Sequence, residues 1–324
     1  MEQVLLLMPE HFSREVLPIL RTYLRGFEII ALSGEETTEI ISEALNRSHY
    51  IVCTGVEITE AMLSRGTNLR LVQKWGSGID GIDLKAAERF NITVSNAPGE
   101  NATAVAEHFF TLLFALLKKV CKANTSMHNG EWLQSSLIQE GIEEISGKAL
   151  GLIGFGSIGK AIAVRARAFD VEVYYYKRSR LPQPVERELG VHYLGFHELL
   201  RRIDVLGLAL PLNQDSKKLL NYEKLCLLKR SAILINVSRG AILDETDLHR
   251  ILLERKIAGA GLDVFEKEPI SPQNPLLHLE NVIVTPHIAG RTRQAFHRIT
   301  ERCVKNILLV SEGLEALHQI NNTN

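Results

Sequence analysis

One glycine-rich turn constrains the fold of this chain more than any other feature. Gly154-Phe155-Gly156-Ser157-Ile158-Gly159 follows the apolar run Ala149–Ile153 and opens a segment of helical period, Ser157–Phe169. A GxGxxG pattern between a strand and a helix predicts a dinucleotide site. The first glycine allows the tight turn, the second lets the backbone approach a pyrophosphate, and the third lets the helix pack on the strand. The residues predicted to contact the cofactor here are Gly154, Gly156, Ser157, Ile158 and Gly159.

Short apolar runs alternate with helical segments along the whole chain. Predicted strands such as Val4–Met8 and Glu28–Leu32 are separated by helical segments such as Ser13–Leu24. This rhythm predicts an α/β fold with parallel sheets covered by helices. The length of 324 residues is enough for two domains, each with its own core. The residues alone indicate a small first domain, a larger second domain over about 100–289 and a final helix.

Composition excludes several classes of protein. The charges of the 37 basic and 38 acidic residues nearly cancel, so nonspecific electrostatic binding to nucleic acid or to a membrane is not expected. The four cysteines are far apart and have no metal-type spacing, and no apolar run approaches the roughly 20 residues of a membrane span. We therefore expect a soluble, cytoplasmic protein that acts on a small molecule, with no metal site.

The most apolar helical segment follows the breaker cluster Asn96-Ala97-Pro98-Gly99. Its apolar positions recur at three- and four-residue steps from Val105 to Val120. The wide stripe is typical of a helix buried between domains or subunits, although an ordinary core helix has the same periodicity. Both interpretations stay open on spacing alone.

The end of the strand predicted at Val171–Tyr176 indicates which dinucleotide binds. A site for NAD places an acidic residue there, whereas this chain has Lys177-Arg178-Ser179-Arg180, with Glu172 too early and Glu186 too late. Guanidinium groups bind phosphate through charge-assisted forked hydrogen bonds. Lys177, Arg178 and Ser179 therefore predict a 2′-phosphate and a preference for NADP. NAD remains possible if these residues only face solvent.

Three further motifs each follow a predicted strand in the second half of the chain. They are Asn236-Val237-Ser238-Arg239-Gly240, the run from Gly261 to Pro269, and Thr285-Pro286-His287-Ile288-Ala289-Gly290. Ligands in open α/β sheets bind at the carboxyl ends of strands. An arginine, a carboxylate and a histidine that meet there can bind an anion and move a proton. We therefore predict that Arg239, Glu268 and His287 form the catalytic set.

Taken in order, these motifs resemble the D-isomer-specific 2-hydroxyacid dehydrogenases. Gly76-Ser77-Gly78-Ile79-Asp80 and Ala104-Val105-Ala106-Glu107 extend the resemblance over nearly the whole chain. It implies two doubly wound parallel-sheet domains with the active site between them. A flavodoxin-like substrate domain would use residues 1–100 and 290–324, and an inserted Rossmann cofactor domain would use residues 101–289. The resemblance also implies a homodimer built through the helix around 101–120.

The resemblance implies a role for each matched residue. Arg239 would hold the substrate carboxylate and polarise the 2-oxo group. His287 would protonate the carbonyl oxygen as hydride arrives from the nicotinamide, and Glu268 would orient the His287 ring. The backbone of Ser77 and Gly78 would bind the substrate carboxylate from the other domain. The remaining expected cofactor contacts are Asp263, at the nicotinamide carboxamide, and Pro211, Val237 and Gly290.

One departure from the family pattern narrows the expected activity. Lys177 stands where the family's ribose-binding aspartate is expected, which resembles the NADPH-preferring glyoxylate and hydroxypyruvate reductases. Reduction of such a 2-oxoacid to the D-2-hydroxyacid is the favoured activity. A short-form D-3-phosphoglycerate dehydrogenase and a non-catalytic NAD(P)-sensing interaction protein remain as alternatives. Lys74, Trp75 and Arg291 adjoin the motifs, and their roles stay open between substrate selection and simple packing or solvent exposure.

Overall fold

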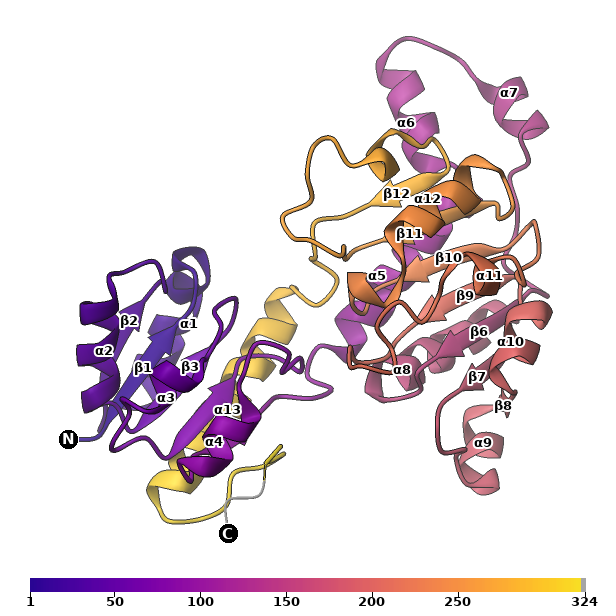
Figure 1. Ribbon diagram of the computed structural model, residues 1–324. Helices are drawn as coiled ribbons and strands as arrows, with labels where there is room; N and C mark the ends of the chain where they lie inside the picture. Colours follow the sequence, from indigo (N-terminus) through magenta and orange to yellow (C-terminus); the bar gives the residue numbers. More distant parts are fainter. Residues whose placement is uncertain (322–324) are drawn as a thin grey trace. The chain divides into compact units, whose positions relative to one another are not determined.

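The computed structural model describes residues 1–321. These residues divide into two compact units: unit 1 consists of Met1–Asn101 and the chain from Arg293 onward, and unit 2 consists of Ala102–Thr292. Each unit is an α/β fold built on one sheet, and every strand pair in both sheets is parallel (Figure 1). The predicted fold class, two parallel-sheet α/β domains, is confirmed.

Unit 1 contains a five-stranded sheet in the order β2-β1-β3-β4-β5. This is the flavodoxin-like order of a doubly wound sheet. Its strands are β1 Gln3–Leu7, β2 Glu28–Leu32, β3 Tyr50–Cys53, β4 Leu71–Lys74 and β5 Thr93–Ser95. Its helices are α1 Glu10–Tyr23, α2 Thr38–Arg47, α3 Glu60–Leu63, α4 Leu84–Arg89 and α13 Arg293–Ser311.

Both faces of the unit 1 sheet are covered, because successive side chains of a strand point to opposite faces. In β1, Val4 and Leu6 pack with α1 and α13, whereas Leu5 and Leu7 pack with α2, α3 and α4. A strand that is buried on both faces reads as a continuous apolar run, which is why β1 is wholly apolar after Gln3. The C-terminal helix α13 therefore belongs to the core of unit 1, some 200 residues after its last strand.

Unit 2 contains a seven-stranded sheet in the order β12-β11-β10-β9-β6-β7-β8. Its strands are β6 Ala149–Ile153, β7 Glu172–Tyr176, β8 Val191–Tyr193, β9 Val205–Leu208, β10 Ile233–Asn236, β11 Gly259–Leu262 and β12 Val282–Val284. Its α-helices are α5 Ala102–Leu117, α6 Val120–His128, α7 Gln134–Gln139, α8 Ser157–Ala166, α9 Gln183–Leu189, α10 Phe196–Arg202, α11 Tyr222–Leu225 and α12 Glu245–Leu253. Three 3-10 turns complete it: η1 Arg167–Phe169, η2 Gly240–Ile242 and η3 Pro275–His278.

The strand order of unit 2 reverses beside β6. The chain starts at the interior strand β6, moves outward through β7 and β8, and then returns to pair β9 with the other side of β6. The order therefore reverses between β6 and β9, and ligands of open α/β sheets bind at this switch point, outside the carboxyl ends of the strands. The glycine-rich turn directly follows β6.

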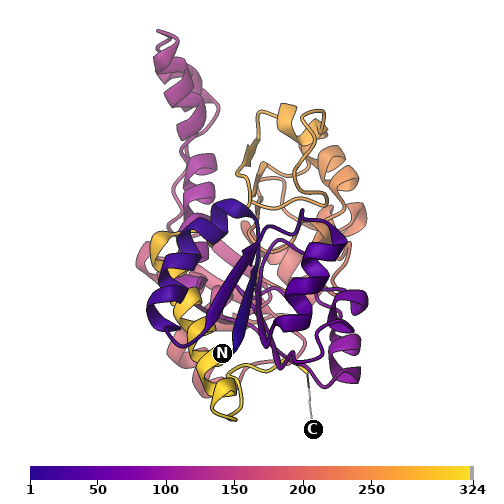
Figure 2. The same ribbon diagram turned by 90° about the vertical axis from the view of Figure 1, so that its left-hand side faces the viewer.

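The long apolar helix differs from its prediction at the C-terminal end. α5 ends at Leu117, and Lys119 adopts a left-handed backbone with φ of 51° before α6 begins at Val120. The periodic stripe continues across this break, which is why the pattern predicted one helix. Figures 1 and 2 show α6 and α7 projecting away from the seven-stranded sheet of unit 2. Within residues 1–321, no helix is both long and apolar enough to cross a membrane.

Candidate active site

The glycine-rich turn has the geometry that a bound dinucleotide requires. Gly154 has φ of +88°, and a Cβ there would lie 2.3 Å from the carbonyl oxygen of Ala209. A Cβ on Gly159 would lie 2.8 Å from the carbonyl oxygen of Gly154, so only glycine lets α8 start this close to the turn. Gly156 differs, because a Cβ on it would meet nothing within 4 Å. The helix start at Gly156 has no side-chain cap, so its backbone N–H groups are open to a ligand. The space beside Gly156 and these N–H groups fit a pyrophosphate.

The basic segment after β7 divides into two parts. Lys177, Arg178 and Ser179 follow directly after Tyr176, and Arg178 makes only a loose ion pair with Asp215 at 3.8 Å, in which both side chains are 82% exposed. Such a pair contributes little and leaves the guanidinium accessible to a phosphate. Arg180 is different, because its Nε and Nη2 donate to the two carboxylate oxygens of Glu186 at 2.9 and 2.8 Å. Arg180, the last cation of the basic stretch, is therefore paired within the fold.

Glu186 is the centre of this second part. Its side chain is 8% exposed and also accepts a hydrogen bond from the Tyr175 hydroxyl at 2.6 Å. The hydrogen bond from Arg180 is the main reason why the pKa of Glu186 is lowered to about 2. Burial and the bond to Glu186 raise the pKa of Tyr175 to about 12. The backbone N–H of Leu181 donates to the same hydroxyl at 2.8 Å, so the network holds the segment after Ser179 against α9.

Removing the Glu186 charge should destabilise the protein. We expect Glu186→Gln to lower the free energy of unfolding at pH 7 by about 2 kcal/mol, because the buried Glu186 carboxylate loses its charge-assisted hydrogen bonds from the half-exposed Arg180. The Glu186 pKa is lower in the folded state than its ordinary 4.5, so its stabilising effect is complete above that pH. As the pH falls from 4.5 towards 2, the effect is lost and the two proteins should converge. Urea denaturation at several pH values measures this, with Glu188→Gln on the exposed face of α9 as control; an equal loss in both variants contradicts the prediction.

His287 and Glu268 form a hydrogen-bonded pair in unit 2. His287 Nδ1 lies 2.6 Å from Glu268 Oε2, and both side chains are partly exposed. The second oxygen of Glu268 accepts a hydrogen bond from the Phe265 N–H at 3.0 Å, which anchors the carboxylate. An ionised carboxylate can only accept, so Nδ1 carries the proton and Nε2 is left for a ligand. The pair can therefore present an oriented imidazole.

The charge on Glu268 is maintained by its surroundings. Burial alone would raise its pKa, but the bonds from His287 and the Phe265 N–H, together with the positive charge of Arg239, lower the pKa below its usual value. Arg239 lies just after β10, and its Nη1 donates to the Ser238 carbonyl at 2.7 Å. The structure thus brings all three predicted catalytic residues into electrostatic range, with an anion-binding cation beside an acid–base pair.

The backbone of His287 is held in an unusual conformation. Its φ is +53°, in the left-handed region that few residues other than glycine adopt. The His287 N–H donates to the Asp263 carbonyl at 2.8 Å, and Arg291 Nε donates to the His287 carbonyl at 2.7 Å. Arg291 therefore contacts the backbone of the histidine directly.

The other predicted site residues are distributed over both units. In unit 2, Pro211 and Val237 follow β9 and β10, and Gly290 and the buried Asp263 flank the His287 turn. Ser77 and Gly78 belong to unit 1, just after β4, where Asn96 Nδ2 donates to the Ser77 carbonyl at 2.8 Å. Lys74 is half-buried at the end of β4.

Trp75 is a core residue of unit 1. It is 7% exposed, its indole N–H donates to Thr300 Oγ1 at 3.1 Å, and its ring contacts Phe296 at a centroid distance of 4.4 Å. These contacts account for Trp75 by core packing rather than by substrate selection, the two roles that the sequence left open.

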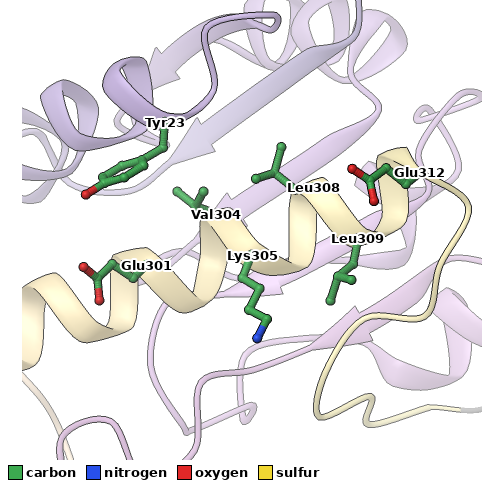
Figure 3. Close-up of a pocket in the computed structure, with 7 residues that line it drawn as sticks. All are labelled: Tyr23, Glu301, Val304, Lys305, Leu308, Leu309 and Glu312. Carbon is green, nitrogen blue, oxygen red and sulfur yellow. The ribbon is translucent and has the colours of Figure 1, made fainter.

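A hollow in unit 1 is lined by residues of α1 and α13. Figure 3 shows Tyr23 of α1 facing α13 across a groove, with charged and apolar side chains alternating along α13. The α13 residues that line it are Glu301, Val304, Lys305, Leu308, Leu309 and Glu312. It contains none of the residues singled out from the motifs.

Sequence analysis missed two groups that the structure places beside predicted residues. His108 of α5 lies 2.9 Å from Thr285 Oγ1 and 3.4 Å from Asp263 Oδ1, and Glu186 binds Arg180 as described above. His108 directly follows the quoted Ala104–Glu107 run, but it lies 177 positions from Thr285. No local pattern could have connected the two.

Comparison with known proteins adds an independent observation. A family model described as D-isomer specific 2-hydroxyacid dehydrogenase, NAD binding domain, matches residues 110–289. Glyoxylate reductase from Pyrococcus furiosus is 38% identical over 260 residues, which cover 79% of this chain and 77% of that protein. Hydroxypyruvate reductase from Thermotoga maritima is 33% identical over 288 residues, which cover 85% of this chain and 92% of that protein.

The fold is also similar to solved structures. An acyclic imino acid reductase in complex with NADPH and D-Arg superposes with a TM-score of 0.87 at 27% identity. The superposition covers 99% of this chain and 100% of that one.

Proposed function

Because this chain belongs to the D-isomer specific 2-hydroxyacid dehydrogenase family, we propose that it reduces a small 2-oxoacid to the D-2-hydroxyacid. Glyoxylate and hydroxypyruvate are the proposed substrates, since relatives named for their reduction match most of the chain. The observation that carries the proposal is the His287–Glu268 pair beside Arg239, in the same unit as the glycine-rich turn. Unit 2 is the proposed cofactor domain, and Ser77 and Gly78 of unit 1 are proposed substrate-binding residues.

We assign cofactor binding to residues at the carboxyl ends of the unit 2 strands. The turn after β6 and the N–H groups at the start of α8 would hold the pyrophosphate. When bound, a nicotinamide supplies the hydride that reduces the 2-oxo carbon. The proposed contacts are Gly154, Gly156, Ser157, Ile158, Gly159, Pro211, Val237, Asp263 and Gly290.

Proton transfer is assigned to His287. Its Nε2 would donate to the 2-oxo oxygen, while the ionised Glu268 holds the ring through Nδ1 and stabilises the imidazolium. Arg239 would bind the substrate carboxylate with its planar fork, which also places positive charge next to the developing oxyanion. After the transfer, the neutral imidazole keeps its proton on Nδ1 and donates a hydrogen bond from it to Glu268.

The proposed preferred cofactor is NADPH. Lys177, Arg178 and Ser179 follow β7, and Arg178 has only a weak exposed partner in Asp215. One structural neighbour was solved with NADPH. NAD stays as the alternative, and 3-phosphohydroxypyruvate is the substrate that would identify a short-form phosphoglycerate dehydrogenase instead.

Initial rates with two cofactors and four oxoacids test the proposal. NADPH and NADH are each measured with glyoxylate, hydroxypyruvate, pyruvate and 3-phosphohydroxypyruvate. We expect the highest kcat/KM with NADPH and glyoxylate or hydroxypyruvate. Turnover of 3-phosphohydroxypyruvate alone would replace the substrate assignment, and no turnover with any of the four would favour the non-catalytic, cofactor-sensing alternative.

Removing the Arg178 charge separates the two cofactors. We expect Arg178→Gln to raise KM for NADPH about tenfold, the effect of losing one charge-assisted phosphate contact. KM for NADH should change by less than about twofold, because no 2′-phosphate is present to lose a partner. Arg187→Gln, on the exposed side of α9, is the control. Equal changes for both cofactors would show that Arg178 does not bind the 2′-phosphate.

We also propose a cytoplasmic homodimer built through the helix around residues 101–120, with the neighbouring α6 and α7 extending the contact. Four apolar side chains are exposed on the segment of α6 and α7, and Trp132 is the most exposed of them at 74%. Several exposed apolar side chains on one short segment are consistent with a contact surface. The four residues are Val120, Met127, Trp132 and Ile138. All four cysteines are free thiols, which supports a reducing compartment.

A further inference from the structure

The buried carboxylate of Asp263 is the centre of a hydrogen-bonded cluster beneath the His287 turn. Asp263 Oδ1 accepts hydrogen bonds from the Thr285 hydroxyl at 2.6 Å and from the Ile288 N–H at 2.9 Å, and Oδ2 accepts one from the Ala289 N–H at 2.8 Å. Asp263 is 1% exposed. Three donors from the segment Thr285–Ala289 therefore converge on one carboxylate, so the segment keeps its shape only while that carboxylate remains in place.

The turn needs this support because of the His287 backbone. A residue other than glycine at φ of +53° is strained by about 1 kcal/mol or more. Such a conformation persists only where its surroundings hold it. The Thr285 and Ile288 bonds to Asp263 flank His287 on both sides, so they fix the position of its Cα.

His108 completes the cluster from a different element, α5. Its Nε2 lies 2.9 Å from Thr285 Oγ1 and 3.4 Å from Asp263 Oδ1. The Thr285 hydroxyl has one proton, and it donates this proton to a carboxylate that can only accept. Thr285 Oγ1 must therefore accept from His108, so the Nε2 of His108 carries a proton. The geometry thus sets the protonation of this nitrogen.

The result is a directed chain from His108 Nε2–H to Thr285 Oγ1–H to Asp263 Oδ1. Hydrogen bonds in such a chain polarise and strengthen one another in a buried site. The chain also compensates the buried negative charge. Burial raises the pKa of Asp263, but the hydrogen bonds from His108, Thr285 and the turn lower it below its usual value.

We propose that His108 is a positioning residue for the acid–base histidine: through Thr285 and Asp263 it holds the turn that presents His287. The inference rests on the proposed function, because it assigns His287 as the proton donor. His108 itself makes no contact with the reacting atoms in this assignment. Its loss loosens the turn, so that His287 samples positions from which proton transfer is slow.

Two substitutions at position 108 distinguish this role from simple packing. His108→Leu fills the position with an apolar side chain and removes the Nε2–H donor. His108→Gln places an amide N–H near the position of Nε2. We expect kcat to fall about tenfold in the leucine variant, because small misplacements of catalytic groups have effects of this size. The glutamine variant should recover most of that loss. His192→Leu, at an exposed position of β8, is the control.

Hydrogen–deuterium exchange gives a readout that does not depend on turnover. The Ile288 and Ala289 amides donate to Asp263, so the peptide covering 285–291 should exchange faster in His108→Leu and at the wild-type rate in His108→Gln. Equal exchange and equal kcat in the wild type and the leucine variant would overturn the inference, and so would a leucine variant whose turn exchanges faster without loss of kcat. If the wild type turns over no oxoacid, the proposed function fails, and exchange alone decides whether His108 holds the turn.

Discussion

His287→Ala is expected to lower kcat for 2-oxoacid reduction about a thousandfold, which is within the usual range for loss of a general acid. The expected loss follows from the pair that His287 forms with Glu268: Nδ1 is occupied at 2.6 Å, so Nε2 is the nitrogen that can give a proton to the substrate. No other histidine among the described residues shares this carboxylate. Single-turnover rates at saturating NADPH measure the effect.

The control for this result is cofactor affinity. NADPH should bind His287→Ala within about twofold of the wild type, because its proposed phosphate contacts lie on other strand ends. His192→Ala, which removes an exposed imidazole on β8, should keep full activity. A His287→Ala enzyme that retains its rate would transfer the acid role to another group, and one that no longer binds NADPH would instead show damage to the fold.

Arg239→Met is expected to lower kcat/KM by about 10²-fold to 10⁴-fold, because two charge-assisted hydrogen bonds to the substrate carboxylate contribute about 1.5–3 kcal/mol each. Methionine has a similar length but no charge, so the packing after β10 is largely kept. Steady-state kinetics with glyoxylate measure this loss.

Arg239→Lys separates charge from shape. Lysine keeps the positive charge near Glu268 but lacks the planar fork, so only part of the activity should return. Arg230→Met, at an exposed position before β10, is the matched control. If lysine restores full activity, the fork is not used and the arginine acts only through its charge. If methionine has no effect, the substrate carboxylate is bound elsewhere.

The sequence contained the features of the fold that depend on local pattern. Continuous apolar runs such as β1 and β6 are strands buried on both faces, and the turn at Gly154 has no room for a side chain. The strands and the glycine turn could therefore be predicted from residue type and spacing. The prediction that Glu268 and His287 lie together also came from pattern, because each follows a parallel strand and such strands end at one edge of a sheet.

The bounds of elements were less predictable. The periodic apolar positions run from Val105 to Val120, but the helix ends at Leu117 and Lys119 is left-handed. The periodicity of apolar residues predicts which side chains face the core, but it does not predict where the helical hydrogen bonds end.

The sequence by itself determined which segments become strands and helices and which residue types stand at the strand ends. Only the tertiary structure decided which of those residues are already engaged: Arg180 is bound by the buried Glu186, whereas Arg178 stays accessible, and His108 reaches Thr285 and Asp263 from a distant helix. The physical reason is that burial and pairing are set by contacts between segments far apart in the chain. A cation beside a strand end looks the same in sequence whether its partner is a cofactor phosphate or a buried carboxylate of its own fold.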